Sequence, residues 1–193
     1  MAVDIRETLD IRAPVDAVWS FMLDPQKIVT CLPGASLDEV VDDRTFVGSV
    51  KIKVGPITTS YKGRLRFAEV DQAVHALRIE GEGRETGGGT ARGTMSSRLR
   101  ALPDGRTELV AEASVDLTGR IMQVGRGMIQ GVSHQLFQQF AAALRARLET
   151  PQGAAAATAE SRPVRVLPLV LCAVWAAIVR FFRRLFGRGD ARG

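Results

Sequence analysis

The residue types that usually carry catalysis are few in this chain of 193 residues. It has two histidines, His75 and His134, and two cysteines, Cys31 and Cys172, which lie far apart in the sequence. Neither histidine has a cysteine, serine or carboxylate at a spacing typical of an activated nucleophile. The cysteines fit neither a disulfide framework nor a CxxC-type metal site, and no protease, hydrolase or nucleotide-binding motif occurs. The sequence therefore predicts a protein that is not an enzyme and holds no metal and no covalent cofactor.

Alternating apolar and polar residues predict the strands that would position a binding site. Five consecutive segments within residues 45–117 have one apolar and one polar face, and residues 3–11 and 37–41 add two more. Short turn sequences separate these segments, for example at residues 55–56 (GP) and 103–105 (PDG). Consecutive strands with short connections form an antiparallel meander, so we expect a curved sheet of about seven strands.

A long helix is predicted to follow the strands, over residues 121–149. Its apolar stripe consists of Met128, Ile129, Val132, Leu136, Phe140, Leu144 and Leu148. Two shorter helices are expected near Val15 and Gln26, but only the long helix can cover the apolar face of the sheet. Residues 1–149 are therefore predicted to form one α+β domain of the helix-grip type, in which the sheet wraps around the C-terminal helix.

The face of the sheet that should pack on this helix carries small side chains. Alternation turns inward Gly48, Gly63, Gly81, Gly83, Ala91, Gly93, Ser97, Ala111 and Ala113. A close-packed core would fill such positions with large branched side chains, so their absence indicates a hydrophobic cavity between helix and sheet. Glycines also let a short sheet curl tightly around its helix, and the sequence does not separate these two explanations.

We expect strands and helices to share the lining of this cavity. The predicted lining residues are Trp19, Ile28, Leu32, Phe46, Ile52, Tyr61, Gly63, Leu65, Phe67, Leu77, Gly81, Gly93, Met95, Met122, Gly125, Met128 and Val132. Few of them are polar, so the expected ligand is a hydrophobic small molecule. Tyr61, the single tyrosine, can hydrogen-bond a ligand or a backbone group. Glu69 and His75 are the inward ionisable residues that we expect.

The C-terminal part of the chain carries the net positive charge. The chain has a net charge of +5, and residues 161–193 hold seven arginines and one acid (+6), which leaves −1 for the first 160 residues. A near-neutral domain lacks the basic surface typical of nucleic-acid binding. Residues 150–163 are small and polar, so we interpret them as a flexible linker with an r.m.s. reach of roughly 20 Å.

Residues 164–193 are predicted to anchor the protein to a membrane. The expected membrane contacts are Leu167, Leu169, Leu171, Trp175, Ile178, Arg180, Phe181, Phe182, Arg183, Arg184, Leu185 and Phe186. The uncharged residues 166–179 fall short of the roughly 20 residues that a spanning helix needs, and arginines opposite phenylalanines are typical of a helix lying in the interface. A short spanning anchor and a helix that docks on a protein remain alternatives. Because no signal segment begins the sequence, we expect the cytoplasmic face of the cell membrane.

Several motifs occur in an order that resembles one known family. They are residues 30–35 (TCLPGA), 48–61 (GSVKIKVGPITTSY), 81–94 (GEGRETGGGTARGT), 107–119 (TELVAEASVDLTG) and 136–140 (LFQQF). Together they resemble the CoxG family of carbon monoxide dehydrogenase subunits, which belongs to the START-like (SRPBCC) superfamily. The resemblance covers about residues 1–148 and implies a helix-grip fold that binds hydrophobic molecules.

The resemblance also implies a function. It suggests a non-catalytic accessory protein that holds a molybdenum-containing carbon monoxide dehydrogenase, or a related molybdenum hydroxylase, at the membrane. With the apolar inner face, it leads us to expect an isoprenoid quinone, menaquinone or ubiquinone, that links carbon monoxide oxidation to the respiratory chain. Tyr61 or a polar group near Gly34 would hold a quinone oxygen. A pure membrane tether or assembly factor, a lipid-binding protein, and an enzyme like the superfamily's cyclases stay open as alternatives.

Overall fold

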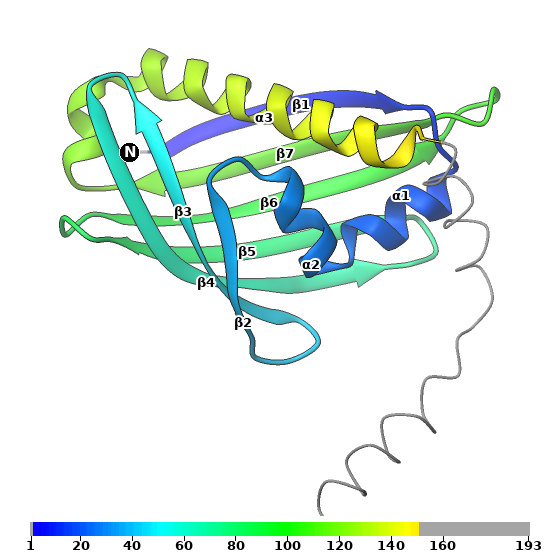
Figure 1. Cartoon of the computed structure of the whole chain (residues 1–193), viewed down its shortest axis with the longest axis horizontal. Helices are drawn as coiled ribbons and strands as arrows, with labels where there is room; N and C mark the ends of the chain where they lie inside the picture. The colour runs from blue at the N-terminus through cyan, green and yellow to red at the C-terminus, as the bar shows by residue number, and fades with distance from the viewer. Residues whose placement is uncertain (1, 151–193) are drawn as a thin grey trace, which may run out of the picture. The chain divides into compact units, whose positions relative to one another are not determined.

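The structure, a computed structural model, describes residues 2–150. Its strands form one antiparallel sheet of seven, in the order β1-β7-β6-β5-β4-β3-β2 (Figure 1). The strands are β1 (Ala2–Ile11), β2 (Ala35–Val40), β3 (Thr45–Val54), β4 (Ile57–Asp71), β5 (Ala76–Glu85), β6 (Thr90–Ala101) and β7 (Thr107–Leu117). The meander and the number of strands expected from the alternating pattern are confirmed.

Short helices connect β1 to β2, and a long helix ends the described region. The first group comprises α1 (Val15–Met22), α2 (Pro25–Ile28) and the 3-10 helix η1 (Val29–Cys31), and the 3-10 helix η2 (Arg120–Val124) and α3 (Arg126–Leu148) follow β7. Asp24 begins α2, since its carboxylate accepts hydrogen bonds from the backbone N–H groups of Gln26 (3.0 Å) and Lys27 (3.1 Å).

The sheet wraps around α3. This helix contacts β1 at one edge of the sheet and β3 near the other edge, and α1 contacts β6 between them. Figure 1 shows α3 lying along the sheet, with α1 and α2 beside it. This arrangement is the helix-grip fold that the order of predicted elements indicated.

Two features differ from the sequence prediction. The apolar spacing predicts a long helix from residue 121, but α3 begins at Arg126, because Gly125 has a φ of +78° and separates α3 from η2. In β4, the pairing register with β5 shifts between Phe67 and Glu69. This bulge turns Glu69 to the exposed face, so the expectation that Glu69 points inward is wrong.

Two separate hydrophobic clusters close the ends of the space between α3 and the sheet. The larger cluster joins the C-terminal half of α3 to α1 and to several strands, and it includes Trp19, Phe67 and Leu144. The smaller cluster joins η2 and the first turns of α3 to β1 and β3 through Val3, Val54, Ile121 and Ile129. Apolar burial therefore stabilises the fold mainly at its two ends.

The inward glycines divide into two kinds. A Cβ atom at Gly63 would overlap the Glu82 carbonyl oxygen, and one at Gly93 would lie 2.5 Å from the Ser114 carbonyl oxygen. A Cβ at Gly83 would make only ordinary contacts, the nearest at 3.5 Å. Close backbone approach explains the first kind, which favours a tightly curled sheet, but it does not explain Gly83.

The residues predicted to form the linker and the membrane anchor lie outside the described residues, apart from Thr150, so those predictions stand as made. Within residues 2–150, no helix is both long enough and apolar enough to cross a membrane.

The two kinds of glycine predict opposite effects of alanine at neighbouring positions, because Gly63 and Gly83 pair across β4 and β5. Gly63→Ala forces a methyl group into backbone atoms and is expected to lower the free energy of unfolding by about 1–3 kcal/mol. Gly83→Ala removes only chain flexibility and is expected to raise it by about 0.5–1 kcal/mol. Urea denaturation of both variants measures the difference; equal effects of the two substitutions would contradict it.

Candidate functional site

A strip of the sheet's inner face between the two hydrophobic clusters keeps contact with solvent. It is formed by Ile5, Glu7, Leu65, Gly81, Gly83, Gly93, Met95, Ala111, Ala113 and Val115, each of which is half-buried or exposed. Cross-strand pairing places these residues side by side, from Ile5 beside Ala113 in β1 and β7 to Gly81 beside Leu65 in β5 and β4. Below, "inner strip" means these ten residues. The helix α3 covers this strip only in part, at its β1 end, where His134 of α3 reaches Glu7.

Several residues predicted to line a cavity belong instead to the packed core. Trp19, Phe46, Phe67 and Leu77 are all buried in the larger cluster, and Ile28 packs against it. The rings of Phe46 and Phe67 meet edge to face with centroids 5.0 Å apart. The Trp19 ring nitrogen donates a hydrogen bond to the Gln72 side chain, so this indole is already satisfied. These side chains form one end wall of the inner strip.

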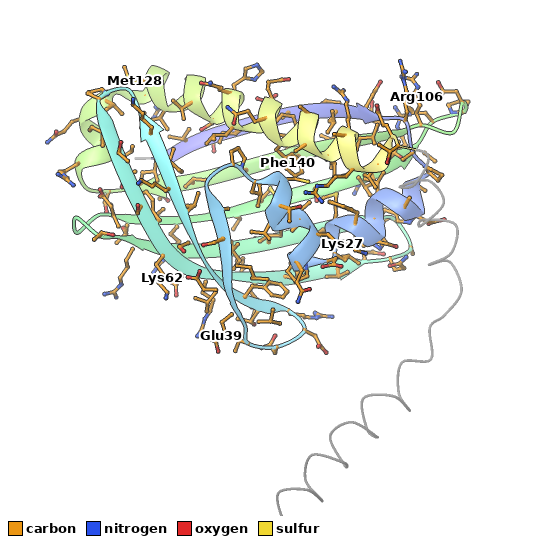
Figure 2. The ribbon with its side chains drawn as sticks, in the orientation of Figure 1. Lys27, Glu39, Lys62, Arg106, Met128 and Phe140 are labelled. Carbon is orange, nitrogen blue, oxygen red and sulfur yellow. The ribbon has the colours of Figure 1, made fainter. Side chains whose placement is uncertain are left out.

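The remaining predicted residues surround the inner strip or lie at its margins. Ile52 and Val132 pack on the smaller cluster, and Gly125 precedes α3. Leu32, Leu65, Met122 and Met128 are exposed although they are large and apolar. Figure 2 shows Met128 over the turn between β3 and β4, where its sulfur would lie 2.8 Å from a Cβ at Gly55. The structure therefore brings Leu65, Gly81, Gly93 and Met95 together in the inner strip.

A buried polar group lies at one side of the inner strip. It consists of Thr59 and Tyr61 of β4 and Glu85 of β5, which are 4%, 8% and 6% exposed. Tyr61 and Glu85 are direct cross-strand partners. Within residues 2–150, neither hydroxyl and neither carboxylate oxygen makes a hydrogen bond of acceptable geometry. Buried polar atoms without a hydrogen bond lower stability, so a ligand that hydrogen-bonds to this group would offset that cost.

Glu85 is the member of this group that the sequence analysis missed. Its side chain is 1% exposed, and Oε1 lies 3.9 Å from Nη2 of Arg120 in η2. A Cβ at Gly89 would lie 2.5 Å from Oε2, so only glycine fits beside the carboxylate. Glu85 has the same strand parity as Gly81 and Gly83, and that pattern could have placed it inward.

The environment of Tyr61 changes its acidity. Burial raises the pKa of the Tyr61 hydroxyl, the nearby Thr59 hydroxyl lowers it in part, and the negative charge of Glu85 raises it further. The hydroxyl therefore stays protonated and remains a hydrogen-bond donor at neutral pH.

The two histidines connect helices to the sheet rather than forming a catalytic pair. Nδ1 of His134 in α3 lies 2.7 Å from Oε1 of Glu7, an inward residue of β1. Nε2 of His75 lies 3.2 Å from Oδ1 of Asp16 in α1. Glu7 is thus another inward acid that the sequence analysis overlooked, and its carboxylate is engaged.

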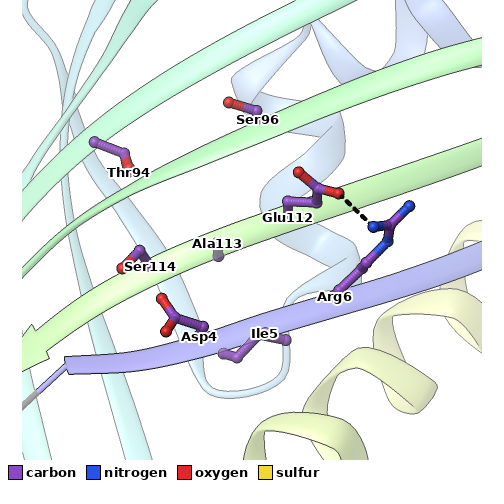
Figure 3. Close-up of a pocket in the computed structure, with 8 residues that line it drawn as sticks. All are labelled: Asp4, Ile5, Arg6, Thr94, Ser96, Glu112, Ala113 and Ser114. Carbon is purple, nitrogen blue, oxygen red and sulfur yellow. Dashed lines mark ion pairs between the residues drawn. The ribbon is translucent and has the colours of Figure 1, made fainter.

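A shallow depression of about 410 Å³ lies on the outer face of the sheet, near the edge formed by β1. Its lining combines polar residues, among them Asp4, Thr94 and Ser114, with Ile5 and Ala113, and Arg6 and Glu112 form an ion pair of 3.2 Å beside it (Figure 3). Because the depression lies on the outer face, it differs in place from the cavity that the sequence predicts between helix and sheet.

Metal ligation finds no support in residues 2–150, where no cluster of three or more histidine, cysteine, aspartate or glutamate side chains could hold an ion. Cys31 is buried, and burial raises the pKa of its thiol, which disfavours the reactive thiolate.

Alkaline titration tests the surroundings of Tyr61. Because it is the only tyrosine, the ultraviolet absorbance of tyrosinate reports its ionisation alone. We expect the pKa to lie above the usual value of about 10 and to fall in Glu85→Gln, which removes one cause of the increase. A raised folded-state pKa means that the free energy of unfolding falls as the pH rises above about 10. A Tyr61 pKa near its usual value that does not change in Glu85→Gln would contradict this description of the surroundings of Tyr61.

Comparison of the fold with solved structures gives neighbours of low sequence identity. A conserved protein from Geobacillus kaustophilus has a TM-score of 0.70 at 18% identity, over 76% of this chain and 95% of that one. The Zhui aromatase/cyclase from Streptomyces sp. R1128 has a TM-score of 0.59 at 15% identity, over 79% and 99%. A START superfamily protein from Mycobacterium smegmatis has a TM-score of 0.52 at 14% identity, over 76% and 97%. These likenesses support the fold alone, which is START-like.

Sequence comparison is more specific about the family. No match was found among curated proteins. The family model for the CoxG subunit of carbon monoxide dehydrogenase matches residues 8–149, which is more than half of the chain and nearly all of the helix-grip domain. The chain therefore belongs to the CoxG family of carbon monoxide dehydrogenase subunits.

Proposed function

We propose that this protein is a non-catalytic accessory subunit that binds a hydrophobic ligand, a respiratory quinone, on the inner strip and links carbon monoxide dehydrogenase to the membrane. The observation that carries this proposal is the partial exposure of the inner strip between two packed clusters. When a ligand covers apolar surface that is still exposed to solvent, the free energy falls by about 25 cal/mol for each Å² buried.

The chemistry of the inner strip suits a ring with an apolar chain. Leu65, Met95 and Val115 offer apolar contacts, and the glycines and alanines between them leave room for a flat group. The polar group formed by Thr59, Tyr61 and Glu85 lies at one side and can fix the orientation of a ligand that carries oxygen atoms. A prenylated quinone combines these two features.

Membership of the family supports the partner, a carbon monoxide dehydrogenase or related molybdenum hydroxylase. Its electrons have to reach a quinone that is dissolved in lipid. A domain tethered to the cytoplasmic face of the membrane by residues 164–193 would carry the quinone between bilayer and enzyme, while the partner's own cofactors transfer the electrons.

The main alternative is a tether whose inner strip stays empty. The tight backbone contacts of Gly63 and Gly93 favour that alternative at their own positions, since sheet curvature explains them without a ligand. Sheet curvature does not explain Gly83, where an added Cβ would make only ordinary contacts. Ala111 and Ala113 are likewise small residues of the inner strip, and each already carries a Cβ.

Ligand recovery tests the proposal most directly. The full-length protein is purified from its own host membranes, and native mass spectrometry with solvent extraction identifies what co-purifies. We expect an isoprenoid quinone. Ala113→Leu, which fills the inner strip, is expected to reduce recovery at least tenfold, because the added side chain occupies the space of the ligand.

Ser114→Leu is the matched control, because Ser114 is the next residue of β7 and lies on the outer face. It should leave recovery unchanged. Clean ligand-free protein from repeated preparations, with no binding of added quinone, would leave the membrane tether as the better explanation.

Membrane binding by the tail is tested separately, in the full-length chain with Arg180, Arg183 and Arg184 changed to glutamine. Each basic residue near an anionic surface contributes about 1 kcal/mol, so the triple variant should bind anionic vesicles roughly a hundredfold more weakly. Co-sedimentation measures this binding, and neutral vesicles should show little difference between variant and parent. Unchanged binding to anionic vesicles would argue against an interfacial basic helix.

A further inference from the structure

The buried polar group of Thr59, Tyr61 and Glu85 has a hydrogen-bonding pattern that a quinone does not match. Three side chains, each more than nine-tenths buried, present four oxygen atoms without a hydrogen bond in residues 2–150. Two are hydroxyls, which both donate and accept, and two belong to the Glu85 carboxylate, which only accepts.

The oxidised and reduced forms of a quinone differ in this respect. The ring oxygens of a quinone are carbonyls and only accept hydrogen bonds, so Tyr61 and Thr59 can donate to them but Glu85 repels them. The ring oxygens of a quinol are hydroxyls, and such a hydroxyl can donate to the Glu85 carboxylate. That bond is charge-assisted and therefore stronger than a neutral one.

We infer that Thr59, Tyr61 and Glu85 form the headgroup site of the inner strip and that this site binds the hydroxyl-bearing, reduced form of the ligand in preference to the oxidised form. This inference rests on the proposed function, because it assigns a redox preference to the same ligand. One additional charge-assisted hydrogen bond predicts a preference of about tenfold or more.

The segment η2 borders the headgroup site. This segment contacts β4, and its Arg120 reaches Glu85. Glycines with positive φ stand at both ends of η2, Gly119 at +89° and Gly125 at +78°. Ile121 is the only buried residue of η2, so little apolar surface would be exposed if η2 moved away from the sheet.

The preference has a consequence for the bound couple, in which the quinone takes up two electrons and two protons to give the quinol. The electrons come from the partner dehydrogenase and the protons from solvent. Tighter binding of the quinol by tenfold raises the midpoint potential of the bound couple by about 30 mV. The protein would thereby favour the transfer of electrons from the dehydrogenase to its own ligand.

Binding of the two redox forms tests the inference. The full-length protein is titrated, under anaerobic conditions, with a short-chain naphthoquinone and with the same compound reduced to the quinol, and calorimetry gives both dissociation constants. We expect the quinol to bind about tenfold more tightly or better. Glu85→Gln should abolish the preference, because its amide lacks the charge that strengthens the bond from the quinol and can itself donate to a quinone carbonyl. Quinol binding should therefore weaken, whereas quinone binding should not.

Glu82→Gln is the matched control, since Glu82 lies on the outer face of the same strand, where it pairs with Arg92 at 3.3 Å. It should keep the preference. Equal binding of the two forms by the unchanged protein would overturn the redox preference and leave the proposed function intact. This comparison does not depend on whether any variant folds. Failure of both forms to bind would reject the quinone-binding function together with the preference.

Discussion

A single helix is too narrow to cover the inner face of seven strands. An α-helix with its side chains is about 10–12 Å wide, whereas seven strands spaced by about 4.8 Å extend over roughly 29 Å. The sheet therefore has to curl around the helix, receive other cover, or leave part of its inner face open. All three occur: the backbones of β4 and β5 approach closely at Gly63, α1 and η2 cover the two ends, and the inner strip remains between them.

This constraint separates the residues that stabilise the fold from those available for binding. Trp19 and Leu144 at one end, and Ile121 and Ile129 at the other, are nearly inaccessible to solvent, and the two clusters to which they belong provide most of the apolar stabilisation. Of the inner strip, only Ile5 packs against either cluster. The proposed ligand would therefore cover surface that contributes little to the packed core, which a close-packed helix-on-sheet interface would not offer.

The sequence is sufficient for the features that depend on periodicity. Alternation predicts the meander, and the spacing of apolar residues predicts a long C-terminal helix. Prediction from periodicity fails where a single residue interrupts the repeat. The bulge after Phe67 turns Glu69 outward, and the positive φ of Gly125 delays the start of α3. It also cannot distinguish Gly63 from Gly83, because the distance between neighbouring backbones is a tertiary property. The alternation along β5 predicts that the Glu85 side chain points inward. A charged side chain is usually exposed, however, so the sequence does not suggest that Glu85 is buried.

The position of Glu85 is hard to explain by folding alone. A carboxylate whose oxygens lack hydrogen bonds is costly to bury, and an apolar side chain would fill the same space at no such cost. The surroundings are nevertheless adapted to it, since Gly89 and Gly119 leave room for Oε2 and Arg120 lies near Oε1. Three positions from two other segments thus accommodate one group that weakens the fold. Such a cost is typical of a binding site, where the missing partner is a ligand, and it makes Glu85 a better indicator of function than the apolar residues around it.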